Sequence, residues 1–386
     1  MMALVSISLI APLAIHIFLP LIPVVRASFA ISEGLAGLTF SIALLAMSLS
    51  TLVYGALSDR YGRRRVLLSG LALFTLGSAL SALAPSIGVL ILGRTIQAIG
   101  AGCGVALSRA IARDAYGSEV LVKIFAYLTM AYTLGPMISP LLGGMLVDLS
   151  GWRSVFWLAT AFGCLVILMA WLVLYETHVK EDAQQASAGF LRNYAALFSN
   201  ARFNAFVLQT GFASGAFMAS ATAASYLMKG PLGRSATEFG LYFAIYPIGY
   251  LLGNLVSSKL SQRFSIETMV LAGALINAAA AAFQAVAILS GHLLPWIIFI
   301  PGGVMTFGQG IGIASAQVGA IRVIPSLSGT AAGIGACMPL LLGAAFSQLY
   351  SGLADGTPMP MVITVSLGAA LALLSGIASY RLKPGR

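Results

Sequence analysis

Apolar runs long enough to cross a lipid bilayer recur from one end of this 386-residue sequence to the other. A membrane-spanning helix takes roughly 20 mostly apolar residues. The twelve runs lie at residues 3–25, 36–57, 66–84, 86–111, 120–146, 154–174, 203–227, 236–259, 266–290, 293–321, 327–352 and 360–381. They are continuous rather than alternating, and lipid offers the backbone no hydrogen-bond partners, so they predict helices and not the strands of a membrane barrel. The predicted fold class is an all-α membrane protein with twelve transmembrane helices.

The composition supports this prediction and argues against a nucleic-acid-binding role. The sequence is 59% hydrophobic and 8% charged, and its mean hydropathy is +0.96, outside the range of water-soluble domains. The net charge of +10 would favour nucleic acid in a soluble protein. In a membrane protein the position of the charges decides their meaning.

The basic residues are divided unevenly between the two sets of links that join the spans. Of the 21 lysines and arginines, Arg94 lies inside a span and four lie on one side, namely Arg26, Arg153, Lys229 and Arg234. All of the others lie on the opposite side. By the positive-inside rule that side is cytoplasmic, so we expect a multi-pass protein of the bacterial inner membrane with both termini in the cytoplasm.

The sequence carries no signature of an enzyme, a metal site or a cofactor. Cys103, Cys164 and Cys337 all fall in apolar spans without disulfide or metal-ligand spacing. The three histidines are scattered, and neither G-x-S-x-G nor a phosphate-binding G-x-x-x-x-G-K-[ST] occurs. The start, "MMALVSISLI", lacks the basic region of a signal peptide and is kept as the first span. Because no soluble domain can house an ATPase, an ion gradient is the expected source of energy.

A polar stretch at residues 175–202 separates six spans from six. It divides the chain into bundles at 1–174 and 203–386, with a cytoplasmic linker between them. At an offset of 203 residues, "LSDRYGRRRV" falls on "LSQRFSIETM", and Pro136 falls on Pro339. One offset that aligns two separate places suggests a duplicated half, a known feature of secondary transporters.

The link "YGALSDRYGRRRVLLSG" between the second and third spans holds much of the charge of this chain. Gly55 allows close approach of a neighbouring helix, and Gly62 permits a tight turn. Anchoring at lipid headgroups accounts for Arg64 and Arg65. It does not require Asp59, and an acid among bases indicates an ion pair that forms and breaks.

This link resembles motif A of the major facilitator superfamily, G-x-L-x-D-R-x-G-R-[KR]-x, through Gly55, Leu57, Asp59, Arg60, Gly62, Arg63 and Arg64. The resemblance implies that the aspartate meets the start of helix 11. It also implies that the later arginine pairs with an acid at the end of helix 4, which locks the inner gate while the cavity faces outward. The lock would comprise Asp59, Arg63 and Asp114, with Arg113 beside them.

The fourth span contains "LGRTIQAIGAG", which resembles motif B, R-x-x-Q-G-x-G, through Arg94, Gln97, Gly100 and Gly102, with one residue inserted. A guanidinium in the bilayer costs about 2.5 to 3.5 kcal/mol on insertion scales, so it faces protein or a water-filled cavity. Arg94 is therefore the main candidate for substrate binding or proton coupling. A structural arginine bound to helix-end carbonyls is the alternative.

The fifth span contains "LGPMISPLLGGMLVD", which resembles motif C of antiporters, G-P-x-x-x-P-x-x-G-G, through Gly135, Pro136, Pro140, Gly143 and Gly144. Prolines free backbone carbonyls and kink a helix, and small residues allow close packing. We expect a hinge or seal here, with an ordinary packing interface as the alternative.

The first span contains "IHIFLPLIP", which is similar to the D-x-Y-x-P of bicyclomycin-resistance exporters, with His16 in place of the acid. At about 1.5 Å per residue, His16 lies roughly 20 Å from the cytoplasmic start of its span and Arg94 roughly 12 Å from the outer start of its own, so the two can share a level. Histidine titrates near neutral pH. His16 either carries the coupled proton or only hydrogen-bonds substrate or backbone.

Outside the gate, no span carries a carboxylate near its middle. A cavity with Arg94 and His16 but no acid disfavours permanently cationic compounds, which predicts neutral or anionic amphiphilic substrates. Tyr242, Tyr246 and Tyr250 recur every four residues and offer an aromatic lining, with packing as the alternative. Further candidates for polar contacts are Gln97, Gln209, Gln309 and Gln317.

Together the resemblances imply a monomeric member of the drug:proton antiporter family, similar to bicyclomycin and chloramphenicol resistance transporters. Its two pseudo-symmetric six-helix bundles would give alternating access to a central cavity. The expected partners are a small-molecule substrate, protons and the lipid bilayer, with no nucleic acid and no cofactor. An uncoupled facilitator or a nutrient or metabolite importer of the same fold stays open, as does a non-transporting receptor.

Overall fold

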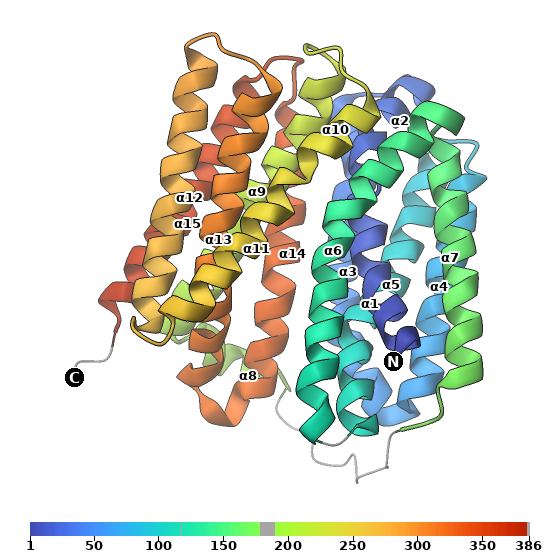
Figure 1. Ribbon diagram of the computed structural model, residues 1–386, viewed down its shortest axis with the longest axis vertical. Coiled ribbons are helices and arrows are strands. Elements are labelled where there is room, and N and C mark those ends of the chain that lie inside the picture. The colour runs from blue at the N-terminus through green and yellow to red at the C-terminus, as the bar shows by residue number, and fades with distance from the viewer. Residues whose placement is uncertain (117, 178–189, 384–386) are drawn as a thin grey trace. The chain divides into compact units, whose positions relative to one another are not determined.

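The computed structural model describes residues 1–116, 118–177 and 190–383, and these residues form helices without a β-strand (Figure 1). The chain forms two compact units, Met1–Gln185 with Ser235–Leu241 and Ala186–Arg234 with Tyr242–Arg386. The short segment Ser235–Leu241 thus packs with the first unit, although the chain around it belongs to the second. Residues 178–189 of the predicted linker lie outside the described residues.

The helices follow the apolar runs closely. In the first half they are α1 Met2–His16, η1 Leu19–Leu21, α2 Ile22–Phe29, α3 Glu33–Tyr61, α4 Arg63–Ala82, α5 Ile87–Ala115, α6 Ser118–Ser150 and α7 Trp152–Val173. In the second half they are α8 Phe190–Phe198, α9 Ala201–Lys229, α10 Ala236–Phe243, α11 Ile245–Leu260, α12 Ile266–Leu289, α13 Pro295–Val323, η3 Pro325–Leu327, α14 Ser328–Leu353 and α15 Met359–Arg381. The predicted linker at 175–202 therefore contains a helix, α8, whose Leu197 is buried beside Phe203 and Phe206 of the second unit.

Eleven of the predicted spans form helices that are long and apolar enough to cross a membrane in the described part of the chain. The remaining one, predicted at 203–227, is α9, which has 29 residues but is rich in Ala, Gly, Ser and Thr. Nearly every side chain of α9 between Phe203 and Met228 is buried, because α13, α14 and α15 pack around it. A helix enclosed by protein needs less apolar surface than one that faces lipid.

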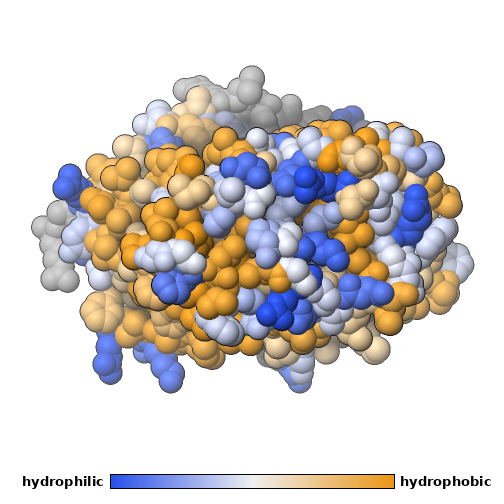
Figure 2. All heavy atoms as spheres, turned by 90° about the horizontal axis from the view of Figure 1, so that it is seen from above, coloured by the Kyte–Doolittle hydropathy of each residue, from blue (hydrophilic) through white to orange (hydrophobic). Residues whose placement is uncertain are grey.

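Lipid-facing flanks explain the distribution of exposed residues on the other helices. In Figure 2, which looks onto one end of the helices, hydrophilic side chains gather on that end face, and hydrophobic residues lie along its edge. Exposed large apolar residues are numerous, for example Leu76, Leu172 and Leu255. This pattern is the one expected when the medium around the helices is hydrocarbon.

The first span is not one uninterrupted helix, as the prediction at 3–25 assumed. Its α-helix ends at His16 and resumes at Ile22 as α2, with a short 3-10 turn between. Pro20 has no N–H to donate to the carbonyl four residues earlier, which belongs to His16, so the α-helical hydrogen bonding stops there. The predicted candidate His16 therefore lies in the last turn before a break.

The eighth span, predicted at 236–259, is also broken. The turn residue Ala244 separates α10 from α11, because Pro247 cannot donate a hydrogen bond to the carbonyl of Phe243. Tyr242 precedes this turn, and Tyr246 and Tyr250 follow it, so the expected single stripe on one continuous helix is wrong.

Candidate functional site

Charged groups at the adjoining ends of α3, α4 and α5 form a cluster around Arg63. The Arg63 guanidinium lies 2.6 Å from Asp59 Oδ1 and 3.0 Å from Asp114 Oδ2. It also donates a hydrogen bond to Ser58 Oγ at 2.5 Å. Arg63 is buried, whereas the Asp59 side chain is 59% exposed. One cation thus holds two carboxylates from different helices, and the more exposed carboxylate is the easier one to release.

The other charged candidate in this cluster is bound more loosely. Arg113 lies 3.7 Å from Asp114 Oδ1, and its side chain is 65% exposed. Such an exposed pair contributes little to stability. Arg113 therefore supplies positive charge near the cluster but does not hold it together.

Glu176, just after α7, completes the cluster and is a residue that sequence reasoning missed. Its Oε1 accepts a hydrogen bond from the backbone N–H of Arg63 at 2.7 Å, and its Oε2 accepts one from Arg64 N–H at 3.2 Å. These N–H groups start α4 and have no partner within the helix, so a carboxylate there is favourable. Glu176 lies 113 residues from Arg63 in sequence, and no local pattern pointed to it.

The two glycines of this link have different surroundings. Gly62 joins α3 to α4 with φ +98°, a conformation that L side chains rarely adopt, and an added Cβ would lie 2.6 Å from Glu176 Oε2. Glycine is needed there for both reasons. At Gly55, in contrast, no described atom lies within 4 Å of an added Cβ. The close helix approach expected at Gly55 is therefore not made by the described residues.

Arg94, in the first half of α5, is 1% exposed and lies between helices of the first unit. Its guanidinium donates to the carbonyl of Ala14 in α1 at 2.8 Å and to that of Thr39 in α3 at 3.4 Å. Its Cζ lies 4.2 Å from the ring centroid of Phe18. The hydrogen-bond partners found for Arg94 are neutral, and its Nη2 has none among the described residues.

Gln97 positions this guanidinium. Gln97 Oε1 accepts from Arg94 Nη1 at 2.5 Å, and its Nε2 donates to Ser78 Oγ in α4 at 2.8 Å. The glycines of the same motif bring the helices together: a Cβ on Gly100 would collide with the backbone of Phe74, and one on Gly102 with Ser50. The inserted residue thus leaves both glycines at close helix contacts.

His16 is buried, and its Nδ1 lies 3.1 Å from the carbonyl oxygen of Pro12, one turn earlier in α1. Arg94 contacts Ala14 and Phe18, which lie two residues before and two residues after His16. The structure therefore places His16 and Arg94 at the same level of the first unit, where the α-helix of the first span ends.

The proline-rich motif of α6 packs onto this break. Both prolines, Pro136 and Pro140, lie inside α6, which runs without interruption to Ser150. A Cβ added to Gly135 would collide with Pro12, and one added to Gly143 with the carbonyl of Ile17. These contacts seat α6 directly against α1 on both sides of His16.

The C-terminal part of α6 makes a similar contact with the segment that starts α10. A Cβ on Gly144 would collide with the carbonyl of Ala236. Asp148, one turn later, accepts hydrogen bonds from the backbone N–H and the hydroxyl of Thr237 at 2.8 and 2.6 Å. No local pattern in the sequence pointed to this role of Asp148.

The tyrosines and glutamines of the second unit are mostly packing residues. Tyr246 is 1% exposed, bonds Ser220 at 3.0 Å, and contacts Phe217, Phe243 and Phe299. Tyr242 stacks on Phe299, with ring centroids 5.4 Å apart. These two tyrosines therefore build the core of the second unit, and Tyr250 is half-buried. Among the other candidates, Gln209 and Gln309 are buried, whereas Gln317 is exposed.

In the described part of the chain, no three His, Cys, Asp or Glu side chains lie close enough to hold a metal ion. Cys103 and Cys337 are buried free thiols, and Cys164 is an exposed one.

Comparison with known proteins identifies the family. The profile of the Major Facilitator Superfamily matches residues 4–348. The chain belongs to the major facilitator superfamily. The predicted fold of twelve transmembrane helices is thereby confirmed, and the protein is a multi-pass membrane transporter and not an enzyme.

Relatives and a solved structure agree with this family. The chain is 23% identical over 378 residues to the bicyclomycin resistance protein homolog of Haemophilus influenzae, covering 95% of this chain and 92% of that protein. It is 27% identical over 333 residues to multidrug resistance protein D of Escherichia coli, covering 86% of this chain and 83% of that protein. The fold also matches the structure of a bacterial homolog of the human lysosomal transporter Spinster, which was solved in an inward-facing, unoccupied conformation. The TM-score is 0.79 at 19% identity, and the match covers 100% of this chain and 98% of that one.

Proposed function

We propose that this transporter exports small neutral or anionic amphiphilic compounds from a bacterial cytoplasm in exchange for protons. The names of its relatives, which include a bicyclomycin resistance protein homolog and multidrug resistance proteins, support drug efflux as the class of transport. The observation that carries the substrate class is the uncompensated charge of Arg94. Its described hydrogen-bond partners are two carbonyls and one carboxamide.

A buried cation without a carboxylate repels a second cation and attracts negative or dipolar groups. The Arg94 guanidinium keeps one N–H-bearing nitrogen without a described partner, so it can donate a hydrogen bond to a carbonyl, hydroxyl or carboxylate of a substrate. Permanently cationic compounds are only repelled by the charge of Arg94. Gln97 acts with Arg94 because it fixes the orientation of the guanidinium.

His16 is the group that we assign to proton coupling. It lies at the end of α1, where the backbone departs from α-helical hydrogen bonding, and discontinuous helices are typical of transporter binding sites. Its proximity to Arg94 couples the two sites, so that a proton on His16 and a substrate group bound to Arg94 influence each other's binding. Antiport requires that the two exclude each other, as competition for the same space beside Arg94 would do.

The remaining motifs would control access to this site. We assign Asp59, Arg63, Asp114 and the neighbouring Arg113 to an inner gate that holds the cytoplasmic ends of α3, α4 and α5, with Gly62 forming its turn. We assign a hinge or seal along α6 to Gly135, Pro136, Pro140, Gly143 and Gly144. Both termini would be cytoplasmic, the membrane would be the inner membrane, and the protein would act as a monomer.

Transport in everted membrane vesicles tests this proposal. We expect uptake of a neutral, chloramphenicol-like compound that an uncoupler abolishes, and weaker uptake of an ethidium-like cation. We expect His16→Ala to abolish substrate-driven proton movement while protein of normal stability still accumulates. Faster transport of the cation would refute the substrate class. Transport that is independent of pH and uncoupler would indicate a facilitator instead.

A further inference from the structure

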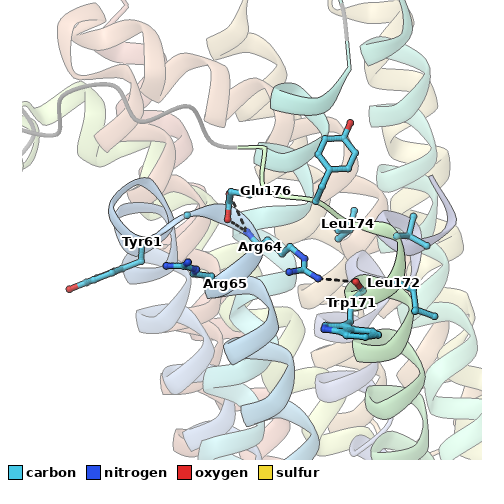
Figure 3. A pocket seen from close by; sticks show the side chains of 10 residues that line it. Tyr61, Arg64, Arg65, Trp171, Leu172, Leu174 and Glu176 are labelled. Atoms are coloured by element: carbon cyan, nitrogen blue, oxygen red, sulfur yellow. Dashed lines mark hydrogen bonds between the residues drawn. The ribbon is translucent and has the colours of Figure 1, made fainter.

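A cavity of about 680 Å³ lies beside the ion-pair cluster, at the end of the first unit where α4 starts and α7 ends. The start of α4 contributes Arg64 and Arg65, and the end of α7 contributes Trp171 and Leu172. Figure 3 shows the Arg64 side chain reaching from α4 toward Trp171, with Glu176 beside the start of α4. We propose that this cavity binds the headgroup of an anionic phospholipid from the leaflet that it faces.

The cavity has an excess of positive charge. Its lining holds two guanidinium groups and one carboxylate, that of Glu176. The Glu176 carboxylate is engaged by the backbone N–H groups of Arg63 and Arg64, so its charge faces the positive end of α4. The two arginines are therefore available to a phosphate, for which the planar guanidinium is well suited.

Arg64 is only partly satisfied by protein. Its Nη2 donates to the carbonyl of Trp171 at 2.9 Å, which fixes the guanidinium at the cavity wall. Its Nε is buried and has no hydrogen-bond partner among the described residues. The N–H groups of the Arg64 and Arg65 guanidinium groups that line the cavity are the donors available to a phosphate oxygen there.

The opposite wall is apolar and faces outward from the helices. Trp171, Leu172 and Val173 are exposed at the end of a membrane-spanning helix, and Tyr175 follows them. Tryptophan and tyrosine favour the depth of lipid headgroups, and exposed leucine and valine favour acyl chains. A ligand with an anionic head and an apolar tail fits both walls, whereas free phosphate uses only the polar one.

Tryptophan fluorescence tests the proposal with the whole protein in bilayers. Trp171 reports on the cavity, because Trp152 and Trp157 lie near the opposite end of α7 and Trp296 lies in α13 of the second unit. The probe is quenching by lipid brominated high on its acyl chains, measured for phosphatidylglycerol against phosphatidylcholine. The contribution of Trp171 is the quenching lost in Trp171→Phe.

We expect phosphatidylglycerol to compete for the cavity more strongly than phosphatidylcholine. In Arg64→Gln/Arg65→Gln the preference should fall by roughly 30-fold, which corresponds to about 2 kcal/mol for two arginines. In the single variant Arg65→Gln, the preference for phosphatidylglycerol should fall roughly fivefold, on the same estimate for one arginine. This substitution disturbs no described hydrogen bond. The matched control Arg322→Gln/Arg381→Gln removes two exposed arginines elsewhere and should keep the preference.

Three outcomes would overturn the proposal. They are equal quenching of Trp171 by the two lipids, equal loss of preference in the control variant, and displacement of phosphatidylglycerol by excess inorganic phosphate, which would indicate a site for free phosphate. None of these measurements depends on transport, so their result is independent of the substrate proposed above.

Discussion

Asp148 caps the start of α10, because its Oδ2 accepts both the backbone N–H and the hydroxyl of Thr237, at 2.8 and 2.6 Å. The carboxylate belongs to α6, the helix whose glycines touch α1 and Ala236. This hydrogen-bonded pair thus joins the antiporter-like motif to a segment that comes from the other half of the sequence.

Removal of this cap should loosen that segment. We expect Asp148→Ala to lower the free energy of unfolding by about 1 kcal/mol, the usual contribution of an N-cap. Thr237→Val should cost less, since the backbone N–H still donates to Asp148. Thermal unfolding in detergent measures both, and an effect of Thr237→Val as large as that of Asp148→Ala would contradict the capping role.

The ion-pair cluster predicts an asymmetry between neighbouring arginines. Arg63→Ala leaves Asp59 and Asp114 without their shared cation and should destabilise the protein by about 2 kcal/mol, less than a fully buried pair because both acids are partly exposed. Arg113→Ala should change stability by less than about 0.5 kcal/mol. Comparable losses in the two variants, again from thermal unfolding, would argue against Arg63 as the centre of the cluster.

The gate assigned to this cluster has its own test. Asp59→Asn removes the charge of the most exposed acid while keeping its shape, so we expect a severalfold fall in transport rate with little loss of stability. The measurement is substrate uptake into everted vesicles, normalised to the amount of folded protein. Unchanged uptake would remove the gate assignment while leaving the structural role of Arg63 intact.

Arg94 should not tolerate lysine. A lysine ammonium cannot match the planar fork that reaches Ala14, Thr39 and Gln97 together, so Arg94→Lys should lower both stability and transport although the charge is kept. Gln97→Leu should reproduce part of the defect, because Arg94 loses one partner. Substrate-binding affinity and unfolding are to be compared in the same preparations, and wild-type behaviour of Arg94→Lys would show that charge alone matters.

The close crossing of α4 and α5 predicts a contrast between two glycines. A Cβ on Gly77 would collide with the backbone of Gln97, whereas none of the described atoms lies within 4 Å of a Cβ on Gly88. Gly77→Ala should therefore destabilise by about 1 to 3 kcal/mol, and Gly88→Ala should be close to neutral. Equal melting temperatures for the two variants would mean that α4 and α5 can move apart without a loss of stability.

The sequence alone predicted the helical fold well, because each membrane span has to satisfy its own backbone and is therefore visible as an apolar run. It missed the two breaks, although Pro20 and Pro247 are local signals for both. The length of an apolar run indicates that it can span the membrane. It does not indicate whether the α-helical hydrogen bonds continue along the whole run.

Side-chain partners were predictable only where a motif carried them. The pairing of Arg63 with Asp114 came from resemblance to a family motif. The carboxylates of Glu176 and Asp148 serve helices that start far away in the sequence, so no periodicity or spacing could reveal them. Tyr246 shows where spacing alone leaves two interpretations open, since its regular spacing with Tyr242 fits a lining or packing, and its contacts with Ser220 and Phe299 favour packing.

The enclosure of α9 bears on how this protein is made. Ribosomes release the helix before α13, α14 and α15 exist, yet those three supply most of its surroundings. Its many small and hydroxyl-bearing side chains give this helix a weak affinity for lipid on its own. Its stable insertion into the bilayer therefore depends on helices that are synthesised later. A nascent chain truncated after α9 would therefore expose that helix to cellular quality control as an incompletely folded segment.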